Sequence, residues 1–350
     1  MAVLSLLEDS GAYRACEWDL TEDADGRAYW LDLFRTHILT ITDLIQAEEG
    51  AAVTPRLDAF LAEYLDGLEI LDTQPDAWGP LNVLKLTLYR QDLLARHGFP
   101  DPFAEVKARE TAAAIALYPN VVARVDALAP AARLEALAFA VMAGNEFDLG
   151  SKETTERYQN DGHDFAEAMC RVSPRPWPED DLDGWSARLL GGHPVYRRAL
   201  FFVDNAGADV ILGCLPLARE LARMGSRVTV AANTLPALND ITIGELDDAF
   251  KALRTMDPVL DAAMCDGRIR TVASGCRAPL IDLTDVSDAC AEAGRGADLV
   301  ILEGMGRSVE TNRSARFVCD ALRIALIKDS WVARHVGVPL FSPAWRFHRV

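Results

Sequence analysis

The stretch ALFFVDNAGADVILGCLPLARELARMGSRVTVAAN, residues 199–233, decides the fold. It opens with a short apolar run at 199–203, continues through a helix-like stretch at 208–224 and returns to an apolar run at 227–232. An apolar strand, a helix and a second apolar strand in direct succession are typical of a parallel sheet whose two faces are both covered. The stretch therefore predicts an α/β unit.

The same alternation continues to the end of the chain. Further short apolar runs follow, and helix-like stretches separate them; the runs are 269–273, 298–302 and 322–327, and the helix-like stretches are 243–256, 284–293 and 329–336. We therefore expect a Rossmann-like α/β domain in three layers, with a parallel sheet between two layers of helices.

The first half of the chain has a helical period instead. Thr54 and Pro55 suit an N-cap and a first helical residue, and an apolar face follows at Leu57, Leu61, Tyr64, Leu65 and Leu68. Further helices are expected near 29–46, 81–96, 103–117 and 131–143. The segment 173–181 contains three prolines and an acidic run, which favour a connector. We thus predict an all-α domain at 1–178 before the α/β domain at 179–350.

The charge balance restricts the partners of the chain. It has 35 lysines and arginines against 53 aspartates and glutamates, a formal net charge of −18. So acidic a surface repels phosphate backbones and anionic lipids, which argues against nucleic acid and membranes as partners. A small anionic substrate would need a local positive site, such as a metal ion.

The cysteines and the N-terminus predict a cytoplasmic protein. The seven cysteines are scattered without a CxxC pair, which is typical of reduced thiols rather than a disulfide framework. The N-terminus has no basic segment before its short apolar run, unlike a signal peptide. The sequence contains no run of 18 uncharged apolar residues, so we expect no membrane span.

Polar residues gather where the predicted strands end. Ligands of such sheets bind beyond the carboxyl ends of the strands. Four of these ends carry groups suited to a metal or a phosphate: Asp204 and Asn205, Asn233, Glu303 with the following Gly304, Met305, Gly306 and Arg307, and Lys328.

Asp240 joins this set by a local argument. Thr242 and Glu245 have the spacing of a capping box, which begins a helix at 242 and leaves Asp240 in the loop after the second strand. Two carboxylates and an amide, from Asp204, Asp240 and Asn205, are hard oxygen ligands that suit Mg²⁺ or Mn²⁺.

Other interpretations of these residues stay open. Asp204 and Asn205 could cap a turn, and Asp240 could simply be a solvated acid. Glu303 could be a buried acid with satisfied hydrogen bonds, and Lys328 a solvated lysine. Other chemistries lack their motifs: the sequence contains no GxxxxGK[ST], HExxH or GxSxG. Cys276 has no histidine at a strand end to activate it as a nucleophile.

Three strings together resemble the damage-control phosphatases, the "domain of unknown function 89" proteins. They are residues 202–209, residues 231–240 and the Glu-Gly-Met-Gly-Arg string at 303–307. The last is similar to the hallmark of a subfamily found as stand-alone plant proteins and fused behind an inactive pantothenate kinase in animals. The resemblance extends more weakly to 101–103 and to 144–148, which include Asn145 and Asp148.

The resemblance implies a phosphatase that depends on Mn²⁺, Ni²⁺, Co²⁺ or Mg²⁺, with Asp204, Asn205 and Asp240 as metal ligands. The implied substrates are 4′-phosphopantetheine and its oxidised or damaged forms. No kinase domain precedes the phosphatase here, which resembles the stand-alone form. Two alternatives remain: a sugar-phosphate phosphatase, and a non-catalytic module that binds a small molecule.

Hydrolysis of a phosphate ester needs charge neutralisation and an in-line nucleophile, and these needs predict the role of each residue. We expect Lys328 and Arg307 to hold phosphate oxygens and Glu303 to position a water. Asp204 could instead attack phosphorus through an aspartyl-phosphate, and both routes stay open. The remaining residues expected to contact the substrate or its phosphate are Asn145, Asp148, Asn233, Gly304, Met305 and Gly306.

Overall fold

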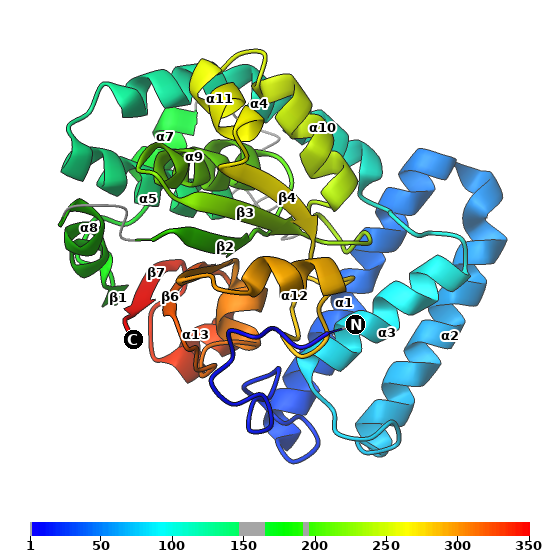
Figure 1. Ribbon diagram of the computed structural model, residues 1–350. Helices are drawn as coiled ribbons and strands as arrows, with labels where there is room; N and C mark the ends of the chain where they lie inside the picture. Colours follow the sequence, from blue (N-terminus) through cyan, green and yellow to red (C-terminus); the bar gives the residue numbers. More distant parts are fainter. Residues whose placement is uncertain (1, 147–164, 192–195) are drawn as a thin grey trace.

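The first half of the chain is helical, as predicted. The computed structural model describes residues 2–146, 165–191 and 196–350. Its N-terminal helices confirm the predicted ones: α1 (Ala24–Glu49), α2 (Thr54–Thr73), α3 (Val83–Arg96), α4 (Ala104–Asp126) and α5 (Pro130–Glu146). Helix α3 begins two residues later than its pattern indicated, whereas the others extend further at one end or both. In Figure 1 α1, α2 and α3 form a group beside the sheet, whereas α4 and α5 lie across one of its faces.

Helix α2 differs in two details from its prediction. A 3-10 turn at Ala51–Val53 leads directly into it, so Thr54 is its first residue and donates its hydroxyl to the carbonyl of Ala51 at 3.0 Å. Its buried face includes Phe60, whereas Leu65 is 40% exposed. Leu57, Phe60, Tyr64 and Leu68 follow one another at helical spacing on the buried face, and Leu65 lies outside that face.

The second half is a seven-stranded sheet with the order β1-β7-β6-β5-β2-β3-β4. All neighbours are parallel except β6 and β7. The strands are β1 (Glu179–Asp180), β2 (Arg198–Phe202), β3 (Arg227–Ala232), β4 (Ile269–Ala273), β5 (Leu299–Glu303), β6 (Asp320–Ile327) and β7 (Ser342–His348). The predicted Rossmann-like sheet is confirmed, with two additional strands, β1 and β7.

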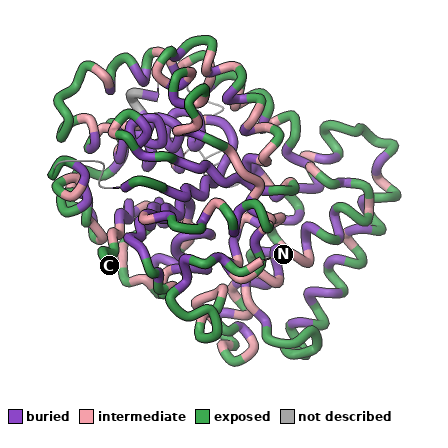
Figure 2. The backbone as a smooth tube through the Cα atoms, viewed as in Figure 1, coloured by how far each residue is buried: buried purple, intermediate pink, exposed green. Residues whose placement is uncertain are grey.

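Alternate residues of β2 explain why its sequence is apolar throughout. Phe201 packs in a core shared with α4, α5 and α9 (Leu215–Arg223). Phe202 packs in the opposite core, with α12 (Asp288–Gly294) and the N-terminal segment around Leu4. Both faces of the strand are therefore buried, and in Figure 2 the buried backbone runs through the sheet while the outer helices are largely exposed.

The remaining helices connect the strands. They are α7 (Phe165–Arg171), α8 (Leu182–Leu190), α10 (Ile243–Leu253), α11 (Pro258–Cys265) and α13 (Ser330–Val336), with single turns of π-helix, η2 (Asp209–Cys214) and η3 (Gly306–Glu310). The stretch expected as one helix at 208–224 is thus a π-helix followed by α9. Pro216, near the start of α9, lacks the amide that would continue regular α-helical hydrogen bonding.

The two halves share their hydrophobic cores. One core combines Leu137 of α5 with Phe201 of the sheet. Another combines Leu86 of α3 with Ile327 of β6. The domain boundary near residue 178 stays a prediction. None of the described helices has the length and apolar character that a bilayer span requires.

Candidate metal and phosphate site

The polar residues at the strand ends meet as predicted at one edge of the sheet. Asp204 and Asn205 follow β2, and Asn233 follows β3. The loop after β3 folds back so that Asp240 forms a β-bridge with Asn205, and the amide of Ile241 donates to the Asp204 carbonyl at 3.0 Å. These four polar side chains are nearly inaccessible, with Asp240 only 1% exposed.

A capping box fixes where this loop ends. The Thr242 hydroxyl accepts the amide of Glu245, and the Glu245 carboxylate accepts the Thr242 amide at 2.8 Å, as the sequence predicts. Helix α10 therefore begins at Ile243 and leaves Asp240 in the loop.

Arg307 lies between the two carboxylates. Its Nη2 donates to Asp240 at 2.6 Å and to the side-chain oxygen of Asn233 at 2.9 Å, while its Nη1 donates to Asp204. The guanidinium is 1% exposed, and burial lowers the pKa of Arg307 to about 9. One buried cation thus pairs with two buried carboxylates at this site.

This geometry tests whether the residues suit a divalent cation. The carboxylates of Asp204 and Asp240 already converge on a single positive group. Asn205 lies beside Asp204, with its amide nitrogen 3.1 Å from the Asp204 carboxylate. Two carboxylates and an adjacent amide are the hard oxygen donors that Mg²⁺ and Mn²⁺ prefer. The types of donor therefore suit such a metal, although in this structure the Arg307 guanidinium is the positive group between the two carboxylates.

Both glycines of the string 303–307 are required by close contacts. Gly304 has a φ of +97°, and a Cβ there would lie 2.4 Å from the carboxyl carbon of Asp204. A Cβ at Gly306 would lie 2.4 Å from the carbonyl oxygen of Pro279. The loop can therefore approach Asp204, and bring Arg307 to it, only because these positions have no side chain.

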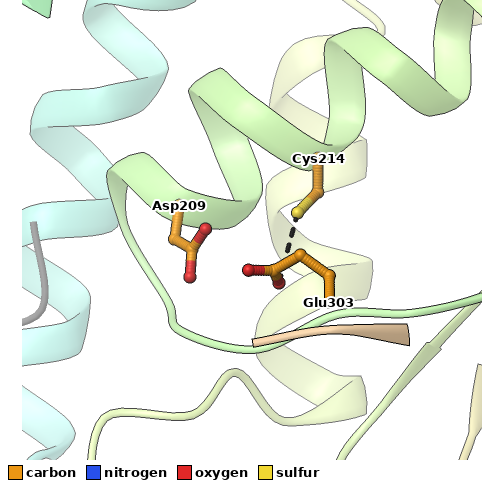
Figure 3. Close-up of side chains that lie close together, drawn as sticks. All are labelled: Asp209, Cys214 and Glu303. Carbon is orange, nitrogen blue, oxygen red and sulfur yellow. Dashed lines mark hydrogen bonds between the residues drawn. The ribbon is translucent and has the colours of Figure 1, made fainter. Parts of the chain in front are cut away.

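A second acidic cluster, which we call the lower cluster, lies next to Asp204 and Asn205. Asp209, Cys214 and Glu303 place their ligand atoms within 4.8 Å of one another, and all three are buried (Figure 3). The Cys214 sulfur is 3.5 Å from Glu303. One carboxylate oxygen of Asp209, Oδ1, is buried and has no hydrogen-bond partner among the described residues. Such a group could hold a cation or a proton.

Asn145, from the end of α5, connects this cluster to the helical half. Its side-chain nitrogen donates to Asp209 and to Glu303, both at 2.9 Å. The second oxygen of Glu303 accepts the amide of Asp204 at 3.0 Å. Glu303 thus joins the two clusters, and a residue of the helical half completes the site.

Burial governs the protonation of the lower cluster. It raises the pKa of Glu303 well above its usual value, and the neighbouring Asp209 raises it further. Burial also raises the pKa of Asp209, although Lys328 opposes the shift. The pKa of the Cys214 thiol is raised too, chiefly by burial. Two carboxyl groups this close share a proton unless a cation neutralises them.

A model of the damage-control phosphatase ARMT1-like domain matches residues 38–342. The chain belongs to this family. This confirms the resemblance in the three strings, and with it the expectation of a phosphatase.

Several individual proteins are also similar to this chain. It is 38% identical to a damage-control phosphatase of Arabidopsis thaliana, over 92% of this chain and 88% of that one. It is 37% identical to pantothenate kinase 2 of Arabidopsis thaliana and 32% identical to a 4′-phosphopantetheine phosphatase of Mus musculus, but it spans only 40% and 48% of their lengths. A solved domain-of-unknown-function-89 protein from Pyrococcus horikoshii shares the fold, with a TM-score of 0.64 at 17% identity, over 91% of this chain and 97% of that one.

The other predicted site residues of this damage-control phosphatase domain lie around the same edge. The Lys328 ammonium donates to the Asn145 carbonyl at 2.9 Å, so it reaches the lower cluster. Met305 packs against the apolar core of α1–α3, and its sulfur is 3.4 Å from the Lys328 amide. Asp148 lies outside the described residues. The amide of Gly207, which follows Asp204 and Asn205 in the chain, donates to the Thr111 hydroxyl at 3.1 Å.

Asp209 and Cys214 were not among the predicted site residues. They are five residues apart, a spacing that does not share a face of an α-helix but does share one in the π-helix η2. The one available signal was that Asp209 falls within the family-like string 202–209.

Two other features lie apart from this chemistry. Burial raises the pKa of the Cys276 thiol to about 12, and its sulfur donates to the Leu280 carbonyl at 2.9 Å, which agrees with its exclusion as a nucleophile. A cavity of about 380 Å³, lined by Arg198, Arg227 and Arg270, opens near the amino ends of β2 and β3. It is therefore at the opposite end of these strands from the carboxylates.

Proposed function

We propose that this chain is a metal-dependent phosphatase that removes phosphate from 4′-phosphopantetheine and its oxidised or damaged forms, in the metabolism of coenzyme A. The observation that carries the proposal is the convergence of the Asp204 and Asp240 carboxylates, with Arg307 between them, at the carboxyl edge of the sheet. The similarity to the mouse 4′-phosphopantetheine phosphatase supports the substrate class, and the similarity to the Arabidopsis damage-control phosphatase supports the phosphatase activity. We also propose that it acts in the cytoplasm.

The metal ligands in this proposal are Asp204, Asn205 and Asp240, with Mn²⁺, Ni²⁺, Co²⁺ or Mg²⁺ as the ion. When bound, the ion would supply charge neutralisation on the phosphate and polarise phosphorus. The lower cluster of Asp209, Cys214 and Glu303 is the other group of donors that suits a cation. We assign it the supporting role, because Glu303 accepts the Asp204 amide and so fixes the backbone that carries Asp204.

The residues of the chain contribute positive charge and orientation. Arg307 is already buried against the two carboxylates, and Lys328 lies at the neighbouring strand end. Both are cations that can bind phosphate oxygens, which an acidic protein would otherwise repel. Glu303, with its raised pKa, can hold a proton at the base of the site. Attack by water and attack by the Asp204 carboxylate are both compatible with this arrangement.

The substrate preference rests on the apolar surroundings. Met305 and Leu238 border the site loops and pack against the core of α1–α3. A pantetheine arm carries a gem-dimethyl group and amides, whereas a sugar presents a ring of hydroxyls. An apolar wall suits the arm, because a site for sugars needs polar groups that bond each hydroxyl.

A substrate comparison tests this proposal. Phosphate release from 4′-phosphopantetheine, its oxidised form, fructose phosphate and glucose phosphate is measured on one preparation with each metal. We expect the highest kcat/KM for a pantetheine substrate. If a hexose phosphate is preferred by about tenfold or more, the sugar-phosphatase alternative replaces this one. A protein that binds these compounds and releases no phosphate from any of them is a binding module.

A further inference from the structure

Arg90 is a buried cation that the chain does not fully satisfy. It lies on α3 and is 3% exposed. Its Nη1 is 3.3 Å from Nδ1 of His37, and its guanidinium lies 5.0 Å from the centre of the Phe34 ring. Its Nε and Nη2 are both buried and have no hydrogen-bond partner among the residues that the structure describes. These two atoms form one edge of the guanidinium fork.

An unsatisfied buried arginine is costly. Each buried donor without a partner loses its hydrogen bonds to water, and a charged group loses more. Burial accordingly lowers the pKa of Arg90, and the charges of Tyr64 and Asp240 only partly oppose this. A fold that needed only to fill this space would be more stable with an apolar side chain. The arginine is therefore better explained by a ligand that completes its hydrogen bonds.

Helix α3 is fixed to the loops of the site. Gln91, the next residue, donates to the carbonyl of Pro236 at 3.0 Å, in the loop that carries Asp240. Asp92 pairs with Arg277, in the loop after β4. These two contacts place this end of α3 beside the loops of the metal and phosphate site.

We propose that Arg90 is a substrate-binding residue contributed by the helical half, and that its Nε–Nη2 edge binds two oxygens of the substrate phosphate beside Asp240. This inference rests on the proposed function. A guanidinium edge matches two oxygens of a phosphate with two parallel hydrogen bonds. A phosphate dianion surrounded by Asp204, Asp240, Asp209 and Glu303 needs cations, and Arg90 adds one to Arg307 and Lys328.

If Arg90 binds the phosphate, one substitution should leave the stability of the free protein unchanged or higher but weaken phosphate binding. Arg90→Met keeps a long side chain and removes the unsatisfied charge. We expect its Tm without ligand to equal or exceed that of the unchanged protein. We also expect the rise in Tm caused by inorganic phosphate, in the presence of Mn²⁺, to disappear. The KM for 4′-phosphopantetheine should rise by about 10- to 100-fold, as for one lost charge-assisted contact, with a smaller change in kcat. Arg90→Lys should recover part of both effects.

Arg96→Met provides the matched control. Arg96 is on the same helix but is 60% exposed, in a surface ion pair with Glu63 at 3.0 Å. This variant should respond to phosphate and substrate as the unchanged protein does.

The inference is overturned if Arg90→Met lowers the Tm of the free protein while its response to phosphate and its KM stay unchanged, because Arg90 would then be structural. It is also overturned if phosphate does not raise the Tm of the unchanged protein. A protein that hydrolyses no phosphate ester but loses its phosphate response in Arg90→Met contradicts the proposed function and supports the anion site.

Discussion

Gly304 lies so close to Asp204 that the Asp204 carboxyl group occupies the space where a side chain at position 304 would begin. A Cβ there would be 2.4 Å from both the carboxyl carbon and one carboxylate oxygen of Asp204. The loop after β5 and the loop after β2 therefore lie in close contact at the centre of the site. The glycine is thus part of the site's geometry rather than a spacer.

Gly304→Ala should therefore abolish most activity. The new methyl group must displace Asp204, and the φ of +97° is strained for alanine. We expect a loss in kcat of about 10²-fold or more, the scale of a disturbed ligand, together with a lower Tm. Gly244→Ala is the control, because a Cβ at Gly244 in α10 meets nothing within 4 Å. If Gly304→Ala and the control are equally active, Asp204 does not need this contact.

Asp240→Asn should reduce both activity and stability. The substitution keeps the shape of the side chain but removes the charge that pairs with Arg307 at 2.6 Å. Activity should fall by about 10²-fold, as for a lost ligand, and a buried cation left with one carboxylate fewer should cost about 3–5 kcal/mol in the free energy of unfolding. Asp248→Asn, whose side chain is 76% exposed on α10, should change neither quantity. Unchanged kinetics in Asp240→Asn would mean that Asp240 is not a ligand.

Glu310 predicts how stability depends on pH. Burial raises its pKa from 4.5 to about 8, with a further rise from Asp329 that Lys328 opposes. Folding favours the protonated acid, so its contribution to stability is complete below pH 4.5 and is lost as the pH rises to about 8. Glu310→Gln cannot ionise. Its free energy of unfolding, relative to the unchanged protein, should rise by about 1.4 kcal/mol per pH unit in that window.

Denaturant unfolding of both proteins at several pH values measures this difference. A difference that stays constant with pH would show that Glu310 titrates normally in the folded protein.

The sheet could be predicted from the sequence, and so could the group of polar residues at the strand ends, because both depend on short-range patterns. Apolar runs mark strands that are buried on both faces, and the polar residue after each run must lie at the same edge. Asp240 could be placed because a capping box fixes the next helix. The strands β1 and β7 could not be predicted, since one has two residues and the other mixes polar and apolar residues.

The lower cluster depends on relationships that no local pattern contains. Asp209 and Cys214 share a face only because η2 is a π-helix. Asn145 approaches them from α5, 64 and more residues away in the chain. The unsatisfied edge of Arg90 appears only when α3 is packed against the site loops. Each of these residues acts through tertiary packing.

Removal of the metal tests the central claim most directly. Phosphate release from 4′-phosphopantetheine is measured after treatment with a chelator and dialysis, and again after the addition of Mn²⁺, Ni²⁺, Co²⁺ or Mg²⁺. We predict that the treated protein is inactive, that at least one of these ions restores activity, and that none restores Asp240→Asn to the same level. Full activity in the chelator-treated protein would contradict the assignment of Asp204, Asn205 and Asp240 as the ligands of a catalytic metal.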